Sequence, residues 1–165
     1  MSDTHLPRGA RRLPDECVAR LRASDLILHA GDLSSLAFLE ELRGLGPPLE
    51  AVAGNADEAA LKAQLPVERV VEVEGVRIGM AHVPGPAAGR AERLVRRFPG
   101  CDAVVFGHTH VAVAEQVGGV WILNPGSPTE RRRASGGHSM LELRIDDREI
   151  EPLLVELSAQ NRHVE

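Results

Sequence analysis

The sequence predicts an α/β fold in which two packed β-sheets are flanked by helices. Short apolar runs alternate with helical patterns in the first half of the chain, and pairs of strands with tight turns follow in the second half. Interleaved strands and helices followed by hairpins are typical of sheets covered by helices. The chain has 165 residues, 43% of them hydrophobic, and no segment with the composition of a linker. We therefore expect a single domain over residues 1–165.

The first half of the chain alternates between helix and strand patterns. Helices are expected over residues 13–23, with Pro14 in the first turn, from residue 36 until the Gly and Pro residues at 44–48, and over 56–65. Ser34 or Ser35 is suited to cap the second of these helices. Buried strands are expected over 25–29 and 49–53, because each is a short apolar run that ends before a glycine.

The second half of the chain is richer in strands. Residues 70–74 and 76–81 are joined by a tight turn and predict a hairpin, followed by a helix over 90–98. A buried strand is expected over 103–106. Two further strand pairs are expected, at 111–117 with 120–123 and at 139–145 with 150–157.

Polar residues with ligand chemistry follow the expected strands at several points. Five segments carry such residues: Asp3-Thr4-His5, Gly31-Asp32, Gly54-Asn55, His82 and Gly107-His108-Thr109-His110. The first is an exception, because no strand precedes it. Strand ends at one rim of a sheet are where α/β proteins gather ligand-binding groups. On extended backbone, residues i and i+2 point the same way, so Asp-x-His and His-x-His each direct two side chains towards one cavity. A glycine before the polar residue allows a sharp turn and a close approach.

The composition of this set predicts a transition-metal centre. Imidazole nitrogens mixed with carboxylate oxygens suit Mn²⁺, Fe, Zn²⁺, Ni²⁺ or Co²⁺ better than Ca²⁺, which prefers oxygen ligands alone. Seven ligands are too many for one tetrahedral ion. They suit two ions about 3.5–4 Å apart that share a carboxylate and a water.

The order of these motifs resembles that of the calcineurin-like metallophosphoesterase superfamily, and in particular of its small YfcE-type phosphodiesterases. The matching stretches lie at 2–5, 28–32, 52–57, 79–82, 107–110 and 124–127, so the resemblance covers nearly the whole chain. It implies a four-layer αββα sandwich, two packed β-sheets flanked by helices. It also places the turn Asn124-Pro125-Gly126-Ser127 beside the site.

The resemblance also implies a role for each ligand. Asp3, His5 and His110 would bind the first metal ion, Asn55, His82 and His108 would bind the second, and Asp32 would bridge the two. We take Asp32, Asn55 and His82 as the catalytic members. The expected cofactor is two divalent ions, with manganese as the first choice and nickel, iron, zinc and cobalt as alternatives. A hydroxide that bridges the ions would attack phosphorus, and a small phosphoester is the expected substrate.

This sequence departs from the family pattern at two points. Many relatives have a histidine directly after the metal-binding Asn, as a candidate general acid, whereas this chain has Ala56. The first strand is also missing, because only Met1 and Ser2 precede Asp3. We therefore expect the chain start to fray, a gap in the core, and weaker binding of the first ion than of the second. We favour a start upstream of Met1, with an apolar strand, over a genuinely short form.

One histidine and one aspartate near the motifs, His29 and Asp57, are interpreted differently from the metal ligands. His29 lies three residues before Asp32, which favours a structural, hydrogen-bonded role over metal ligation. Asp57 is suited equally to a helix N-cap and to accepting hydrogen bonds around the metal ligands.

Two other function classes compete with the enzyme. A non-catalytic scaffold such as the retromer subunit of this fold is one, but its relatives depart from the full ligand set that this chain keeps. A nuclease is the other, and the formal charge of −5 and the 2% of aromatic residues weigh against it. The run Arg131-Arg132-Arg133 is interpreted as a solvated loop in preference to a phosphate clamp. Without a signal peptide or an apolar span we expect a cytoplasmic protein without membrane contact, and a homo-oligomer is compatible with the sequence.

Overall fold

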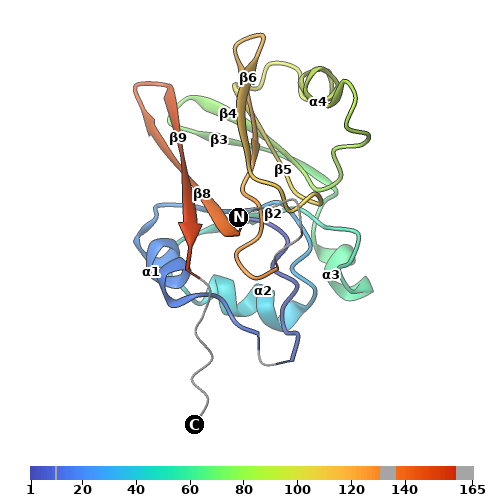
Figure 1. Ribbon diagram of the computed structural model, residues 1–165, viewed down its shortest axis with the longest axis vertical. Helices are drawn as coiled ribbons and strands as arrows, with labels where there is room; N and C mark the ends of the chain where they lie inside the picture. Colours follow the sequence, from blue (N-terminus) through green and yellow to red (C-terminus); the bar gives the residue numbers. More distant parts are fainter. Residues whose placement is uncertain (10, 131–136, 159–165) are drawn as a thin grey trace.

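The computed structural model describes residues 1–9, 11–130 and 137–158 (Figure 1). The basic run at 131–133 lies outside these residues. The first half contains α1 (Asp15–Ala23), β1 (Ile27–His29), α2 (Leu36–Arg43), β2 (Leu49–Ala51) and α3 (Ala59–Gln64). Each lies within or at one end of the range that the sequence predicts. Among the described residues, no helix is long and apolar enough to cross a membrane.

A five-stranded sheet forms the centre of the second half. Its order is β3-β4-β5-β7-β6, where β3 is Glu68–Val73, β4 is Val76–Ala81, β5 is Ala103–Phe106, β7 is Val120–Asn124 and β6 is Val113–Val117. The three inner strands β4, β5 and β7 are parallel, and both edge strands are antiparallel to their neighbours. Strands β1 and β2 also form a parallel pair. The carboxyl ends of parallel strands meet at one rim, which is where the predicted ligands follow.

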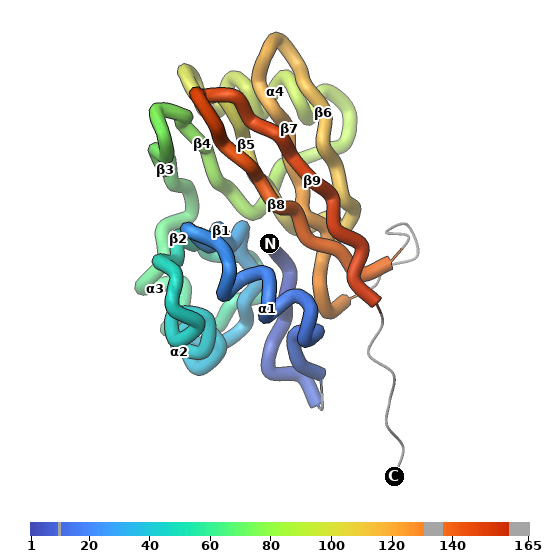
Figure 2. The backbone as a smooth tube through the Cα atoms, turned by 90° about the vertical axis from the view of Figure 1, so that its left-hand side faces the viewer, coloured from blue at the N-terminus to red at the C-terminus, as the bar shows by residue number. Residues whose placement is uncertain are grey.

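The layers follow the predicted order of helix, sheet, sheet and helix. The hairpin of β8 (His138–Asp146) and β9 (Glu149–Leu157) covers one face of the five-stranded sheet, and α4 (Arg90–Arg97) covers the other (Figures 1 and 2). One apolar cluster joins α1 and α2 to β1 and β8–β9, a second lies between β8 and the large sheet, and a third lies under α4. These three cores separate four layers and confirm the predicted sandwich.

Local signals in the sequence explain where the helices begin. Ser35, one of the two predicted caps, has extended backbone and its hydroxyl accepts a hydrogen bond from Phe38 N at 3.2 Å. Pro14 is the N-cap of α1, so this helix begins at Asp15, two residues later than predicted. Strand β1 begins two residues later than predicted and ends at the predicted residue, whereas β2 ends two residues early, where the chain turns into the loop that carries Asn55.

The start of the chain is not frayed, and this prediction is wrong. Met1 is only 6% exposed, its ammonium group donates to Leu28 O at 2.7 Å, and Ala30 N donates to Met1 O at 2.9 Å. The backbone N–H groups of residues 3, 5 and 6 donate in turn to the carbonyl groups of residues 31, 32 and 33. These bonds satisfy backbone groups that a frayed end would leave unpaired.

The predicted gap in the core is present. A cavity of about 900 Å³ lies beside Met1, and Leu28 of β1, Ile78 of β4 and Leu141 and Leu143 of β8 are among the residues that line it. It separates the β1–β2 pair from the β8–β9 pair, which are two separate two-stranded sheets. Burial also lowers the pKa of the Met1 amino group from 8.0 to about 6. The start of the chain is therefore ordered beside a cavity that both apolar and charged residues line.

An apolar extension should fill this space. About five β-branched or apolar residues fused before Met1 are expected to pair with β1 and to bury side chains worth about 1.5–3 kcal/mol each. A stability gain of 1 kcal/mol raises the melting temperature by about 2–4 °C in a domain of this size, so we expect a rise of at least about 4 °C in a thermal melt. A Gly/Ser extension of equal length is the control, because it also converts the amino group to an amide. Equal melting temperatures for the two extensions would contradict this.

Candidate metal centre

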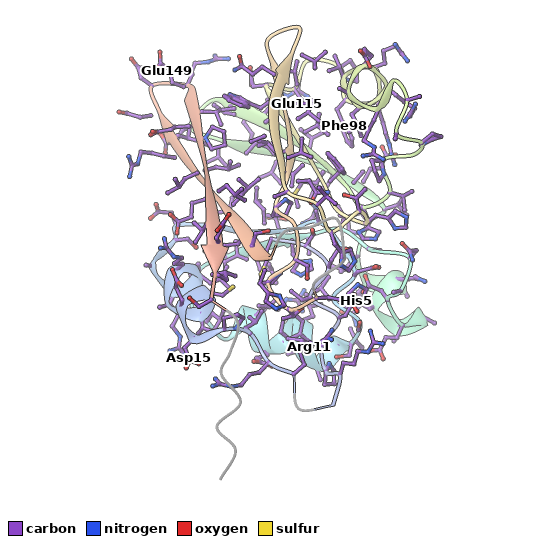
Figure 3. The ribbon with its side chains drawn as sticks, viewed as in Figure 1. His5, Arg11, Asp15, Phe98, Glu115 and Glu149 are labelled. Atoms are coloured by element: carbon purple, nitrogen blue, oxygen red, sulfur yellow. The ribbon has the colours of Figure 1, made fainter. Side chains whose placement is uncertain are left out.

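All seven predicted ligands lie together at the rim formed by the strand ends. Asp32 follows β1, Asn55 follows β2, His82 follows β4, and His108 and His110 follow β5. Asp3 and His5 come from the chain start that pairs with residues 31–33. Figure 3 labels His5 in the lower half of the molecule, on the segment that precedes α1. The parallel arrangement of the strands thus gathers residues from distant parts of the sequence.

One cluster consists of Asp3, His5 and His110. Asp3 Oδ1 is 3.2 Å from His110 Nε2, and His110 Nε2 is 3.4 Å from His5 Nε2. The ligand atoms of these three residues lie within 4.8 Å of one another. Asp3 and His110 are 0% and 1% exposed, so two of the three groups have left bulk water.

A second cluster consists of Asn55, His82 and His108. The Asn55 side-chain oxygen is 3.0 Å from His82 Nε2 and 2.8 Å from His108 Nδ1. His82 is buried, His108 is half-buried and Asn55 is exposed. This cluster is therefore open to solvent on the side of Asn55.

Asp32 lies between the two clusters. Its Oδ2 atom is 3.6 Å from His5 Nε2 and 3.2 Å from His82 Nε2, one imidazole from each cluster. Its other oxygen, Oδ1, accepts a hydrogen bond from Ala56 N at 2.7 Å, which fixes the carboxylate. A single oxygen atom of Asp32 therefore faces both groups.

The spacing of the donor atoms fits divalent cations. Two ligand atoms that share an ion at about 2.0–2.2 Å are about 3.0–3.5 Å apart, depending on the angle between them. The contacts within the clusters and to Asp32 range from 2.8 to 3.6 Å. The donor set of imidazole nitrogens, carboxylates and one amide oxygen suits transition metals. The residues present therefore fit a pair of metal ions that share Asp32.

The charges at the rim are strongly coupled. Burial opposes ionisation of Asp32, but its hydrogen bond and charge interaction with His82 keep the pKa of Asp32 below 3.8. Burial likewise disfavours the His82 cation, yet the carboxylates of Asp32 and Asp3 raise the pKa of His82 above 6.5. When it is protonated, the His82 imidazolium supplies positive charge to the buried carboxylates of the metal-free protein. A bound cation would take over that role.

The i, i+2 argument assumed extended backbone, but the ligand segments are not extended. Five of the seven ligands have left-handed backbone, with φ of 54° at Asp3, 48° at His5, 58° at Asp32, 70° at His108 and 58° at His110. Only a few per cent of non-glycine residues adopt positive φ, and such strain is concentrated at functional sites. The left-handed turns send His108 and His110 into different clusters. The structure places the predicted ligand residues close together, but the backbone that orients them differs from the expected extended one.

Close backbone approach explains the glycines that precede the ligands. A Cβ atom at Gly54 would overlap with the backbone nitrogen and the Oδ1 atom of Asp32, and one at Gly107 would lie 2.7 Å from Ala30 O and 2.9 Å from Asp3 Oδ2. No side chain fits at either position, as the sequence argument expected.

A second ring of contacts fixes the ligands. His82 Nδ1 donates to Ala30 O at 2.8 Å, which leaves Nε2 to face the cluster. Asp57 accepts hydrogen bonds from Ser34 N and Gly54 N, both at 2.7 Å, and so joins the loop after β1 to the loop after β2. Of the two interpretations of Asp57, this contact supports the acceptor role, because Glu58 is the N-cap of α3.

Several further residues fix the ligand segments. The resemblance placed the turn at 124–127 beside the site, and the structure agrees, but the sequence argument named neither Ser2 nor Thr129. Ser2 donates to Asp3 Oδ2 at 2.6 Å, Ser127 to Asp3 O at 2.7 Å, and Thr129 to Thr4 O at 2.6 Å. Asn124 donates to Gly107 O at 3.1 Å, so the turn after β7 also fixes the loop that carries His108. A Ser, Thr or Asn in a turn satisfies its own loop in most proteins, so the sequence held no signal for these long-range bonds.

His29 has the structural role that was predicted. It is fully buried, and its Nε2 atom is 3.1 Å from Thr4 Oγ1. Burial lowers its pKa well below 6.5, so the ring is neutral. It belongs to neither group of candidate ligand atoms found among the described residues.

Comparisons with known proteins agree with this geometry. A family model for the calcineurin-like phosphoesterase superfamily domain matches residues 1–148. A probable metallophosphoesterase of Methanothermobacter thermautotrophicus is 35% identical over 163 residues, which cover 96% of this chain and 91% of the relative. The chain belongs to the calcineurin-like phosphoesterase superfamily.

Two further similarities concern function and fold. A phosphodiesterase of Methanocaldococcus jannaschii is 29% identical over 142 residues, which cover 76% of this chain and 80% of the relative. The crystal structure of Vps29 complexed with Zn²⁺, from Entamoeba histolytica, superposes with a TM-score of 0.75 and 24% identity, covering 93% of this chain and 95% of that one. The latter likeness shows the common fold. The superfamily is metal-dependent, and two groups among the described residues could hold a metal ion: Asp3, His5 and His110, and Asp3, Asp32 and His82.

The raised pKa of His82 makes metal binding pH-dependent. A proton on His82 competes with a cation for Nε2, so the affinity for a divalent ion should rise with pH. The same proton stabilises the metal-free protein below pH 6.5, and this contribution is lost as the pH rises through the elevated pKa of the folded state. We therefore expect the increase in melting temperature caused by 1 mM Mn²⁺ to be larger at pH 8 than at pH 6. Thermal melts of chelator-treated protein with and without Mn²⁺ measure it, and an equal or smaller increase at pH 8 would contradict it.

Proposed function

We propose that this protein is a two-metal phosphodiesterase that hydrolyses small phosphodiesters. The observation that carries the proposal is the position of Asp32, whose Oδ2 atom faces an imidazole of each cluster while Oδ1 is bound to Ala56 N. One shared carboxylate oxygen between two ligand groups is the arrangement that two-metal hydrolases use. The superfamily match and the similarity to a phosphodiesterase support the same reaction class.

The ions would be divalent transition metals, of which manganese is our first choice. When bound, they supply Lewis acidity towards the phosphate oxygens and lower the pKa of water to near neutral. The chain's own contribution is the spacing of the two ions. Asp32 fixes this spacing from one side, and the left-handed turns at His108 and His110 deliver one imidazole to each cluster. No protein side chain needs to act as the nucleophile.

Substrate would approach from the side of the second cluster. Asn55 and Ala56 are exposed there, whereas Asp3 and His110 close the opposite side. Asn55 is a neutral ligand, so it adds no negative charge where a phosphodiester anion must bind. The methyl group of Ala56 leaves room beside Asn55 and cannot donate a proton to a leaving group. These features favour an anionic diester whose leaving group departs without a protein acid.

A non-catalytic scaffold of the same fold is the alternative that the sequence left open. Such a protein would tolerate loss of a ligand, whereas here every residue of both clusters is present. A measurement of metal-dependent hydrolysis separates the two functions directly.

Chelation should abolish the activity, and Mn²⁺ should restore it. Hydrolysis of bis(p-nitrophenyl) phosphate, followed by absorbance, is the assay. Asp32→Asn is expected to lower kcat at least about 100-fold, because it weakens the binding of both ions. Loss of a single outer contact to a metal ligand typically costs about 10–100-fold. Asp25→Asn on an exposed loop is the matched control and should leave the rate unchanged. Full activity of a verified metal-free enzyme would exclude the two-metal mechanism.

Leaving-group quality should control the rate. General acid catalysis typically raises a reaction rate about 10²–10⁴-fold, and the methyl side chain of Ala56 cannot supply it. We therefore expect aryl diesters to be hydrolysed much faster than alkyl monoesters. Ala56→His is expected to raise activity on alkyl esters selectively, while Ala56→Leu, which adds bulk without an acid, should not. The backbone bond from residue 56 to Asp32 is retained in both variants. Comparable kcat/KM values for aryl diesters and alkyl monoesters in the wild type would contradict the prediction.

A further inference from the structure

Glu130 lies against the first cluster, although no motif pointed to it. Its Oε2 atom is 3.4 Å from His5 Nε2 and 3.6 Å from His110 Nδ1. Glu130 belongs to neither group of candidate ligands whose atoms lie within 4.8 Å of one another, and both of those groups contain Asp3. It therefore contacts His110 at the outer nitrogen of the ring, and His5 at the nitrogen that also faces the cluster.

The ring of His110 has one nitrogen for the cluster and one for Glu130. Nε2 faces Asp3, while Nδ1 is buried and makes no hydrogen bond within the part of the chain that the structure describes. The equivalent outer nitrogen of His82 donates to a backbone carbonyl at 2.8 Å. Metal-binding histidines almost always donate this second N–H to a carboxylate or a carbonyl. For His110, Glu130 Oε2 is the carboxylate oxygen beside that nitrogen.

Two arginines and one serine fix the position of Glu130. Its other oxygen, Oε1, accepts from Arg8 Nη1 at 2.9 Å and is 3.6 Å from Arg11 Nη1. Its backbone N–H donates to Ser127 Oγ at 2.8 Å, and this hydroxyl donates to Asp3 O. With Oε1 occupied by the arginines, Oε2 is directed at the imidazoles. Arg11 is labelled in Figure 3 in the same region as His5.

We propose that Glu130 is a positioning residue for the first metal ion. It accepts the Nδ1–H of His110, and thereby fixes the ring with Nε2 towards Asp3 and increases the basicity of that nitrogen. Arg8 and Arg11 hold the carboxylate in place and balance its charge. This proposal rests on the proposed metal centre. Oε2 and Nδ1 are 3.6 Å apart in the metal-free structure, and this distance would shorten to that of a hydrogen bond in the metal-bound protein.

Calorimetric titration of the chelator-treated full chain with Mn²⁺ tests the proposal. Glu130→Ala is expected to weaken one of two sites by about 10–100-fold and to leave the other unchanged. His5→Ala identifies the affected site, because it should remove the same binding event. Glu130→Gln keeps an acceptor oxygen of the same reach and should recover most of the affinity. Arg8→Ala should cause a smaller loss, because it releases the carboxylate without removing it.

A matched control separates this role from a general effect of removing an ion pair. Glu142 also accepts from an arginine, Arg20 Nη1, at 2.9 Å, but lies on β8. Glu142→Ala should bind both ions as the wild type does. Wild-type affinity at both sites in Glu130→Ala, or a Glu130→Gln variant no better than Glu130→Ala, would overturn the positioning role while the metal centre stands. A wild-type protein that binds no Mn²⁺ would overturn the metal centre itself.

Discussion

Backbone pairing of the chain start with the loop after β1 is the contact on which the candidate centre depends. Hydrogen bonds from residues 3, 5 and 6 to residues 31–33 bring Asp3 and His5 opposite Asp32. Ser127 and Thr129 fix the same short segment from its other side through Asp3 O and Thr4 O. Left-handed backbone at Asp3 and His5 costs free energy, and it persists because both flanks are bonded.

The sequence predicted most of the fold because its signals are local. Alternating apolar runs, tight turns and caps such as Ser35 each act over a few residues, and the parallel strand pairs then gather the strand ends at one rim. Five of the seven candidate ligands could be named for the same reason, since they lie in the loops that follow β1, β2, β4 and β5, whereas Asp3 and His5 were named from the motif order alone. The layer order followed from the resemblance to a known family and from the helix and strand pattern together.

What the sequence did not predict depends on contacts between distant residues. Glu130 lies more than a hundred residues from His5, and Ser127 bonds to Asp3 across 124 positions. The ordered chain start was missed because two residues before Asp3 make no strand, whereas a few backbone bonds to Leu28 and Ala30 suffice to order them. The left-handed turns were missed because Asp and His adopt positive φ more often than most residues but still only in a minority of cases, so their presence alone did not indicate it.

Each ligand cluster takes residues from both sides of the sandwich. Asp32 and Asn55 leave β1 and β2, whereas His82, His108 and His110 leave the five-stranded sheet. A cation in either cluster would therefore link the two layers, between which the cavity beside Met1 reduces the packing contact. The same ions that carry the chemistry would then also limit the movement of the two sheets relative to each other. Loss of the ions would therefore affect catalysis and the stability of the sandwich together.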